Sequence, residues 1–453
     1  MGKRLIIVLA LALLVGLTFS AAYAEVQNVK VSGDITMSGV LRKHFGLNQT
    51  TAGDTSVLKQ SFLMTQTRVR VDADLTDNVM ATVRLINERI WNGQNDTNSG
   101  NSSNNTSIDL DLAYVTLKEF LYSPLTLTLG RQEIKFGNGF IIGQSGAAAG
   151  TTNIPTDLSE RRAFDAIRAT LNYDPLVVDL VYAKVRQTTS VDRNDIVLSG
   201  VNATYALTKK TSVSGYYYLK NDDYKNGATS TRPKADKVNT VGVLLSSNPI
   251  DNLTASLEGA YQFGRNSGDT TVSTTQKKHS AWALQAMADY TFAKVKTTPK
   301  IGASYTYLSG GKNNLGSTNQ GWDPMFNDQI LNNITYAILP MTNMSVLNLK
   351  ASCKPVEDVT LAANYGYYDV AQKNKGGSIV SPNYYDGSTS YYSGTYTGKS
   401  HLGDALDLTA TYDYTEDVQF GLTAGAFRAG PALSIQGDKR VAQQVIGSMK
   451  VTF

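Results

Sequence analysis

Residues 252–263 read Asn-Leu-Thr-Ala-Ser-Leu-Glu-Gly-Ala-Tyr-Gln-Phe, and their alternation decides the fold. One parity carries only apolar side chains and a glycine (Leu253, Ala255, Leu257, Gly259, Tyr261, Phe263), whereas the other is mainly polar. Successive side chains of a β-strand point to opposite faces, so the segment predicts a strand with one apolar and one polar face. A stretch of about eleven residues is also what a tilted strand needs to cross a bilayer.

The same alternation recurs along the chain, at residues 108–116, 282–290, 359–367 and 404–413. In the first of these, Leu112 and Tyr114 share the apolar parity opposite Asp109 and Asp111. Tyrosines gather near the expected strand ends, which is typical of the aromatic girdles of membrane barrels. Short polar turns alternate with longer loops rich in Asn, Gly, Ser and Thr, such as 92–107, 309–341 and 370–400. Eight short turns and nine long loops predict about eighteen strands, to within two.

Both ends of the chain point to a secreted membrane protein. Lys3 and Arg4 precede an apolar run over residues 5–19, and Ala22-Tyr23-Ala24 predicts cleavage before Glu25. We therefore expect a signal peptide at 1–24 and a single barrel domain at 25–453; the alternative for the first segment is a membrane anchor. No later stretch is long and apolar enough for a transmembrane helix.

The last residues, 441–453, alternate again and stop on an aromatic ring, with Val441, Val445, Met449, Val451 and Phe453 on one parity. An aromatic end of this kind resembles the terminal signal of bacterial outer-membrane proteins, which the barrel-insertion machinery reads. We expect this strand to pair with residues 29–41 and close the ring. The predicted fold is all-β, a transmembrane antiparallel barrel of about 18 strands in outer-membrane lipid, with short periplasmic turns and long extracellular loops. A soluble β-sandwich or propeller is the alternative that period two alone leaves open.

Composition limits the other function classes. The chain of 453 residues has a formal net charge of +4, and removal of the signal peptide brings it close to neutral. Cys353 is the single cysteine, and the only histidines, His44, His279 and His401, are far apart without metal-ligand spacing. We expect no enzyme activity, no cofactor, no metal and no nucleic-acid partner. A barrel hydrolase and a surface adhesin remain as minor alternatives, and the oligomeric state is not determined.

Charged residues on the barrel strands are expected to face the lumen, because an Arg or Lys facing lipid at mid-depth costs about 2–4 kcal/mol. Parity gives the pore-lining candidates Arg68, Arg70, Asp72, Asp74, Arg84, Glu88, Asp109 and Asp111, with Asp179 and Glu258 also inward. Their role is either mutual pairing along the wall or selection of the solute. The segment 136–162, rich in Gly and Ala, is either a loop folded into the pore or an ordinary surface loop.

Three motifs resemble the alginate-export porin family: Gly130-Arg131-Gln132-Glu133 with the Gly-rich stretch 137–150 after it, 162–168, and 402–409. The resemblance implies an eighteen-stranded outer-membrane barrel with an arginine-rich lumen that conducts an anionic polysaccharide. Arg131 and Arg168 would then be pore-lining residues, with Arg162 nearby. Arg131 shares its parity with Leu125, Leu127 and Leu129, so it lies above the hydrocarbon or is turned inward by a bulge near Gly130.

The candidate residues carry charges of both signs, whereas the lumen of that family is expected to be strongly electropositive. The sequence therefore predicts a porin for passive diffusion of small hydrophilic solutes or oligosaccharides. The alternative is an export channel for an acidic exopolysaccharide.

Overall fold

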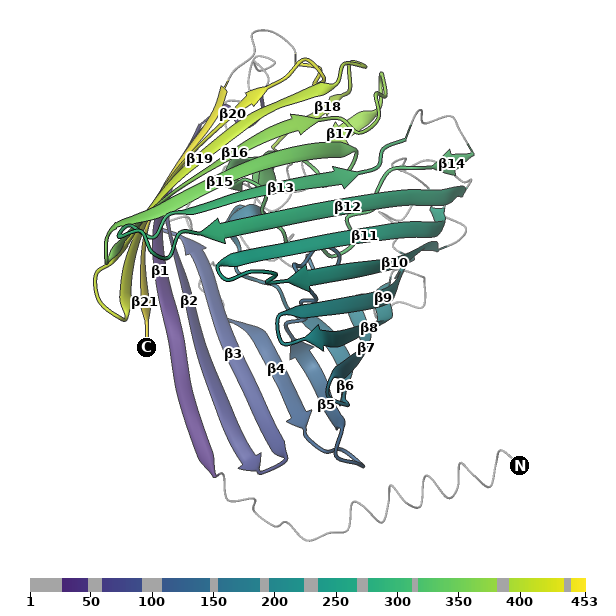
Figure 1. Ribbon diagram of the computed structural model, residues 1–453, viewed down its shortest axis with the longest axis vertical. Coiled ribbons are helices and arrows are strands. Elements are labelled where there is room, and N and C mark those ends of the chain that lie inside the picture. The colour runs from purple at the N-terminus through teal and green to yellow at the C-terminus, as the bar shows by residue number, and fades with distance from the viewer. Residues whose placement is uncertain are drawn as a thin grey trace.

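The chain forms one antiparallel β-barrel in the computed structural model (Figure 1). The structure describes residues 27–47, 59–91, 108–146, 154–187, 195–223, 235–266, 276–311, 317–380, 391–435 and 441–453. The expected signal peptide and the loop at 92–107 lie outside these residues. No helix in the described ranges is long and apolar enough to cross a bilayer.

Eighteen strands make the wall, as the alternating turns and loops predict. They are β1 (Asn28–Lys43), β2 (Lys59–Thr76), β3 (Val79–Ile90), β4 (Asp109–Leu117), β5 (Leu125–Gln132), β6 (Phe164–Asn172), β7 (Leu176–Arg186), β8 (Ile196–Thr208), β9 (Thr211–Asp222), β10 (Asp236–Ser247), β11 (Leu253–Asn266), β12 (Lys277–Thr291), β13 (Lys300–Leu308), β15 (Met344–Val356), β16 (Val359–Asp369), β19 (His401–Asp413), β20 (Val418–Ala429) and β21 (Val441–Thr452).

The remaining elements are short and belong to the connections between wall strands. They are β14 (Thr318–Asn319), the hairpin of β17 (Ser378–Val380) and β18 (Ser393–Thr395), the 3₁₀ turn η3 (Thr156–Leu158) and the helix α2 (Asn333–Ile338).

Closure comes from β1, which pairs with β2 on one side and with β21 on the other, so the predicted partner of the last strand is confirmed. At the seam, the Gly33 N–H donates to the Phe453 carbonyl at 2.8 Å, and the Phe453 N–H donates to the Gly33 carbonyl at 3.0 Å. Gly33 leaves room for the Phe453 ring, because a Cβ at this position would approach its Cζ to 2.7 Å. Figure 1 shows β1 and β21 side by side.

The two faces of the wall follow the predicted parity. In β11, Leu257, Tyr261 and Phe263 are exposed on the outside, whereas Glu258 and Gln262 are buried on the inside. The strands have 8 to 18 residues, enough to span the hydrocarbon when tilted. An apolar band therefore faces lipid, and the polar parity surrounds the lumen.

One strand departs from the prediction. The pairing of β3 with β4 shifts between Arg84, opposite Leu112, and Leu85, opposite Leu110, which is a β-bulge with Asp111 of β4 as the extra residue. The extra residue reverses the parity, so Leu112 is buried and the Tyr114 hydroxyl lies 3.4 Å from the Arg70 guanidinium in the lumen. The assignment of Leu112 and Tyr114 to the lipid face was wrong for this reason.

We predict that charge is tolerated on one face of β20 and not on the other. Leu422→Arg places a guanidinium on the lipid face, where Leu422 is 52% exposed, and should lower the free energy of unfolding by about 2–4 kcal/mol. Thr423→Arg, at the same depth on the lumen face, should lower it far less. Guanidinium titration of protein refolded into lipid vesicles measures both, and equal losses would contradict the assignment of faces.

Candidate functional site

Two loop segments fold into the lumen and form the candidate site together with the wall. The first inner segment, residues 133–146 and 154–163, follows β5, and the second inner segment, residues 309–311 and 317–343, follows β13. From the first, the Asn138 side-chain amide donates to the inward Ser256 hydroxyl of β11 at 3.3 Å. The described part of 136–162 thus enters the lumen and reaches β11 instead of lying on the surface.

The two inner segments hold each other through backbone and aromatic contacts. The Gly143 N–H donates to the Phe326 carbonyl at 2.7 Å, and the Phe326 N–H donates to the Ile141 carbonyl at 3.1 Å. Phe140 stacks on Trp322 with ring centroids 6.1 Å apart. The result is an apolar cluster inside an otherwise polar lumen.

Three wall strands hold the second inner segment. The Lys220 ammonium of β9 pairs with Asp323 at 2.8 Å, and the amide of Gln262 in β11 binds the Asp323 backbone. Burial raises the pKa of Asp323, but the charge and hydrogen bond of Lys220 outweigh it and leave that pKa below its ordinary value. The Asp407 carboxylate of β19 accepts from the Asn333 N–H at 2.7 Å and so caps the N-terminus of α2.

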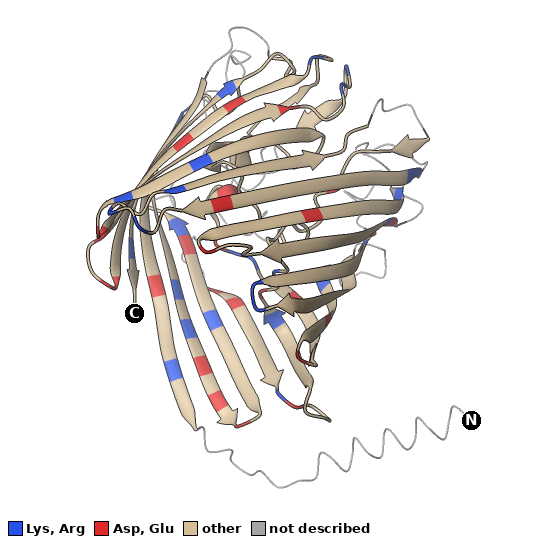
Figure 2. Cartoon of the chain, viewed as in Figure 1, with Lys and Arg blue, Asp and Glu red and all other residues tan. Residues whose placement is uncertain are grey.

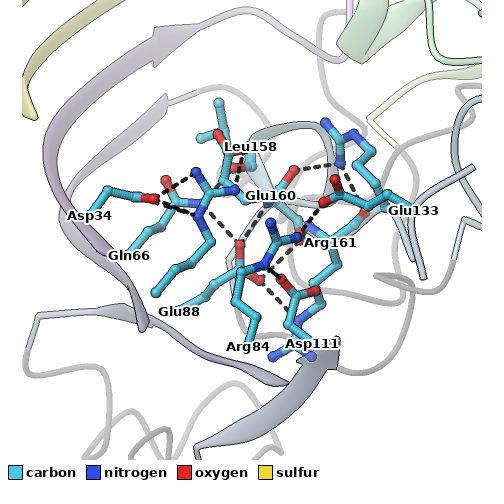
Figure 3. A network of polar contacts seen from close by, with 12 residues as sticks. Asp34, Gln66, Arg84, Glu88, Asp111, Glu133, Leu158, Glu160 and Arg161 are labelled. Carbon is cyan, nitrogen blue, oxygen red and sulfur yellow. Dashed lines mark hydrogen bonds and ion pairs between the residues drawn. The ribbon is translucent and has the colours of Figure 1, made fainter. Parts of the chain in front are cut away.

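The first inner segment is held by a charged network on β1 to β4 (Figure 3). The Glu88 side chain is fully buried at its centre and accepts four hydrogen bonds. The donors are the Gln66 amide (2.9 Å), the Ser159 hydroxyl (3.0 Å), the Glu160 N–H (2.8 Å) and the Arg161 guanidinium (3.1 Å). A buried carboxylate satisfied in this way fixes the returning end of the segment against the wall.

Three guanidinium groups in this network face six carboxylates. Arg161 also binds Asp109 at 2.5 Å, Arg84 binds Asp111 at 2.6 Å and contacts Glu133, and Arg68 binds Asp34 at 2.9 Å and Glu160 at 3.4 Å. Acidic groups therefore exceed basic groups around this part of the lumen.

The other predicted candidates on the lumen face are also paired. Arg70 binds Asp72 at 2.7 Å beside Asp74, and Arg168 binds Asp179 at 2.8 Å. The Arg168 guanidinium also lies 5.4 Å from the centre of the Phe136 ring, so it supports the first inner segment. Glu258 accepts a hydrogen bond from the Tyr216 hydroxyl at 2.8 Å.

Arg131 lies elsewhere. It keeps the parity of Leu129 and pairs at 3.1 Å with Asp165, which is 60% exposed on the outer face of β6. Gly130 has a φ of 118°, but the strand pairing does not shift there. The sequence left two positions open for Arg131, one outside the lumen and one turned inward by a bulge. The structure has the position outside the lumen, so Arg131 does not line the pore.

Sequence reasoning missed several residues that matter here. Arg161 stands next to Arg162, which was considered, and it carries the contact to Glu88. Arg42 is 1% exposed, binds Asp157 at 2.5 Å and Gln444 at 2.8 Å, and contacts Tyr391. Its parity on β1 predicts an inward side chain, but Asp157 and Tyr391 lie on loops whose path the alternation does not predict.

Comparison with known proteins assigns the barrel to a family. The family model described as "Alginate export" matches residues 35–446, which is most of the chain. The chain belongs to the alginate export family. It is an outer-membrane barrel, and the predicted resemblance is confirmed. No curated protein matched the chain.

Several solved structures have the same fold as this alginate-export-family barrel. OccK8 (OprE) from Pseudomonas aeruginosa aligns with a TM-score of 0.58 at 12% identity, over 94% of this chain and 98% of its own. OccAB4 from Acinetobacter baumannii gives 0.56 at 10% identity, over 95% and 100%. Pseudomonas aeruginosa OpdK, solved with vanillate, gives 0.52 at 9% identity, over 94% and 98%. At these identities the likeness concerns the fold.

We predict that Glu88 holds the first inner segment in place. Glu88→Gln leaves Arg161 without its buried counter-charge and should lower the free energy of unfolding by about 3–5 kcal/mol. Glu133→Gln is the matched control, because Glu133 is 46% exposed and its pair with Arg84 should contribute less than about 1 kcal/mol. Denaturant titration in the same vesicles compares the two, and an equal loss would show that Glu88 is no special anchor.

Proposed function

We propose that the protein is a passive outer-membrane channel for small hydrophilic solutes or oligosaccharides, constricted on its extracellular side by the two inner segments. The observation that carries the proposal is the pairing of every described lumen arginine with a carboxylate. These are Arg42, Arg68, Arg70, Arg84, Arg161, Arg162 and Arg168. The guanidinium groups of such a wall are structurally fixed and offer little free positive charge to an anion.

The inner segments set the size of the proposed cargo. They cover the extracellular half of the wall, where Thr240, Gln262, Thr306 and Asn348 are at most 1% exposed. The periplasmic half keeps polar side chains partly exposed, among them Arg70 and Lys300. A cavity of about 220 Å³ lies on that side, lined by Asp289, Lys300, Lys350, Asn364, Asp407 and Thr409, among others. Polar groups of both signs suit a hydroxylated or zwitterionic solute more than a polyanion.

Export of an acidic exopolysaccharide is the second candidate, favoured by the family match. The excess of carboxylates around Glu88 opposes it, because a polyanion would pass them at close range. We also propose that Phe453, which is 58% exposed, is read by the barrel-insertion machinery. The proposal concerns passage through the barrel and assigns no catalytic role to any residue.

Recording from the refolded mature protein in planar bilayers tests the channel. We expect discrete conductance steps and, in a salt gradient, a small reversal potential on the cation-selective side, because carboxylates outnumber guanidinium groups at the constriction. Glu133→Gln with Glu160→Gln should move the reversal potential toward anion selectivity, since both carboxylates are about half exposed. Glu357→Gln with Glu416→Gln, on the periplasmic turns, is the matched control and should change it little.

Two results would contradict the proposal in different ways. Absence of conductance steps from correctly folded protein would remove the channel. Strong anion selectivity, with block by low concentrations of an acidic oligosaccharide, would replace passive diffusion by export of an acidic polymer.

A further inference from the structure

The outer face of the barrel carries three basic residues in one row at the extracellular ends of β10, β11 and β12. Arg265 is directly opposite Lys237 on one neighbouring strand and directly opposite Lys278 on the other. All three are exposed, and their inward neighbours Val238 and His279 are buried, so the row faces outward. We call Lys237, Arg265 and Lys278 the cationic row. Figure 2 shows basic residues in blue at the loop-side ends of β11 and β12.

The row has no carboxylate to balance it among the described residues. The outward positions of β10, β11 and β12 carry no Asp or Glu, and the outward positions of the flanking strands β9 and β13 carry none either. Asp236 lies beside Lys237 in sequence but is 9% exposed on the inner face. Like charges directly opposite on neighbouring strands destabilise a sheet, so the row is unfavourable unless an anion joins it.

Two other outward basic residues at this rim of the barrel, Arg131 and Lys184, are neutralised within the chain. Arg131 pairs with Asp165 at 3.1 Å, and Lys184 pairs with Asp195 at 2.5 Å. The cationic row, in contrast, has no such carboxylate partner among the described residues.

The row also lies at the depth of the lipid headgroups. Directly below it, toward the periplasm, the aromatic residues Tyr261, Phe263 and Trp282 are exposed on the same face. The Tyr261 hydroxyl reaches the Ser280 hydroxyl at 2.9 Å, and the Tyr217 hydroxyl donates to Asn239 at 2.7 Å. In both pairs the polar partner lies two residues nearer the extracellular rim in register, so the hydroxyls mark the upper edge of the hydrocarbon.

The cationic row stands just beyond that edge. Arg265 follows Phe263 by two residues, a rise of about 7 Å along the strand. A lipid whose acyl chains lie against the aromatic rings would therefore bring its headgroup phosphate to the row. Guanidinium and ammonium groups are the usual protein partners of phosphate.

We propose that the cationic row is a binding site for the phosphate groups of an outer-leaflet glycolipid. The ligand is recognised by phosphate on Arg265 and the two flanking lysines and by acyl chains on Tyr261, Phe263 and Trp282. The site lies on the lipid face of the wall and does not depend on what the lumen conducts.

The test measures lipid binding to the mature protein in detergent micelles by native mass spectrometry. The probes are diphosphoryl lipid A, the same lipid without its phosphates, and inorganic phosphate. Each basic residue near a membrane surface contributes about fivefold in affinity. The triple variant Lys237→Gln, Arg265→Gln, Lys278→Gln should therefore bind diphosphoryl lipid A roughly 100-fold more weakly than the unchanged protein.

The matched control is Lys294→Gln, Lys296→Gln, Lys354→Gln, which removes three exposed lysines at the opposite end of β12, β13 and β15. It should keep the affinity of the unchanged protein. The dephosphorylated lipid should not distinguish the three proteins. Retention of heat-modifiable migration on gels shows that each variant is folded.

Three outcomes would overturn the proposal. One is equal binding of diphosphoryl lipid A by the unchanged protein and the triple variant. Another is equal binding of the lipid with and without its phosphates by the unchanged protein. The third is complete displacement by inorganic phosphate at equimolar concentration, which would show that the row binds a free anion and the lipid plays no part.

Discussion

The whole structure depends on one constraint of the bilayer: no backbone N–H or C=O group can remain unpaired in hydrocarbon. A sheet meets this constraint only when its first and last strands pair, as β1 and β21 do. Closure then defines an outside, which must be apolar, and an inside, where charge is stable. The alternation of apolar and polar residues along β11 reflects this difference between the outer and inner faces.

Inside the ring, charge serves attachment. Glu88, Asp407 and Lys220 are wall residues whose partners lie on the two inner segments. A carboxylate or ammonium buried in the lumen needs such a partner, because an unpaired buried charge is strongly destabilising. The inward polar side chains of the wall therefore do more than contact water in the lumen. They determine where the loops come to rest.

The wall could be predicted well from the sequence because strand geometry is a local property of the chain. Period two, the terminal aromatic residue and the alternation of turns and loops follow from strand geometry and are visible residue by residue. The strand number, the seam and the inward position of residues such as Arg68 and Arg84 could be derived in this way. The bulge at Asp111 could not be predicted, because one inserted residue leaves the alternation of residues 108–116 intact in the sequence but turns Tyr114 to the lumen face. The loop partners of Glu88 and Arg42 were equally hidden, because the paths of these loops depend on tertiary contacts. The described parts of 309–343 fold into the lumen without any periodic pattern that predicts it.

Arg42 joins parts of the chain that are synthesised far apart. Its guanidinium, on the first wall strand, donates to Gln444 on the last one, and it also contacts Asp157 and Tyr391 on two different loops. The bond to Gln444 cannot form until the final strand has been added. One side chain therefore couples closure of the ring to the two loops: Arg42 reaches its full set of partners only when the last strand is in place.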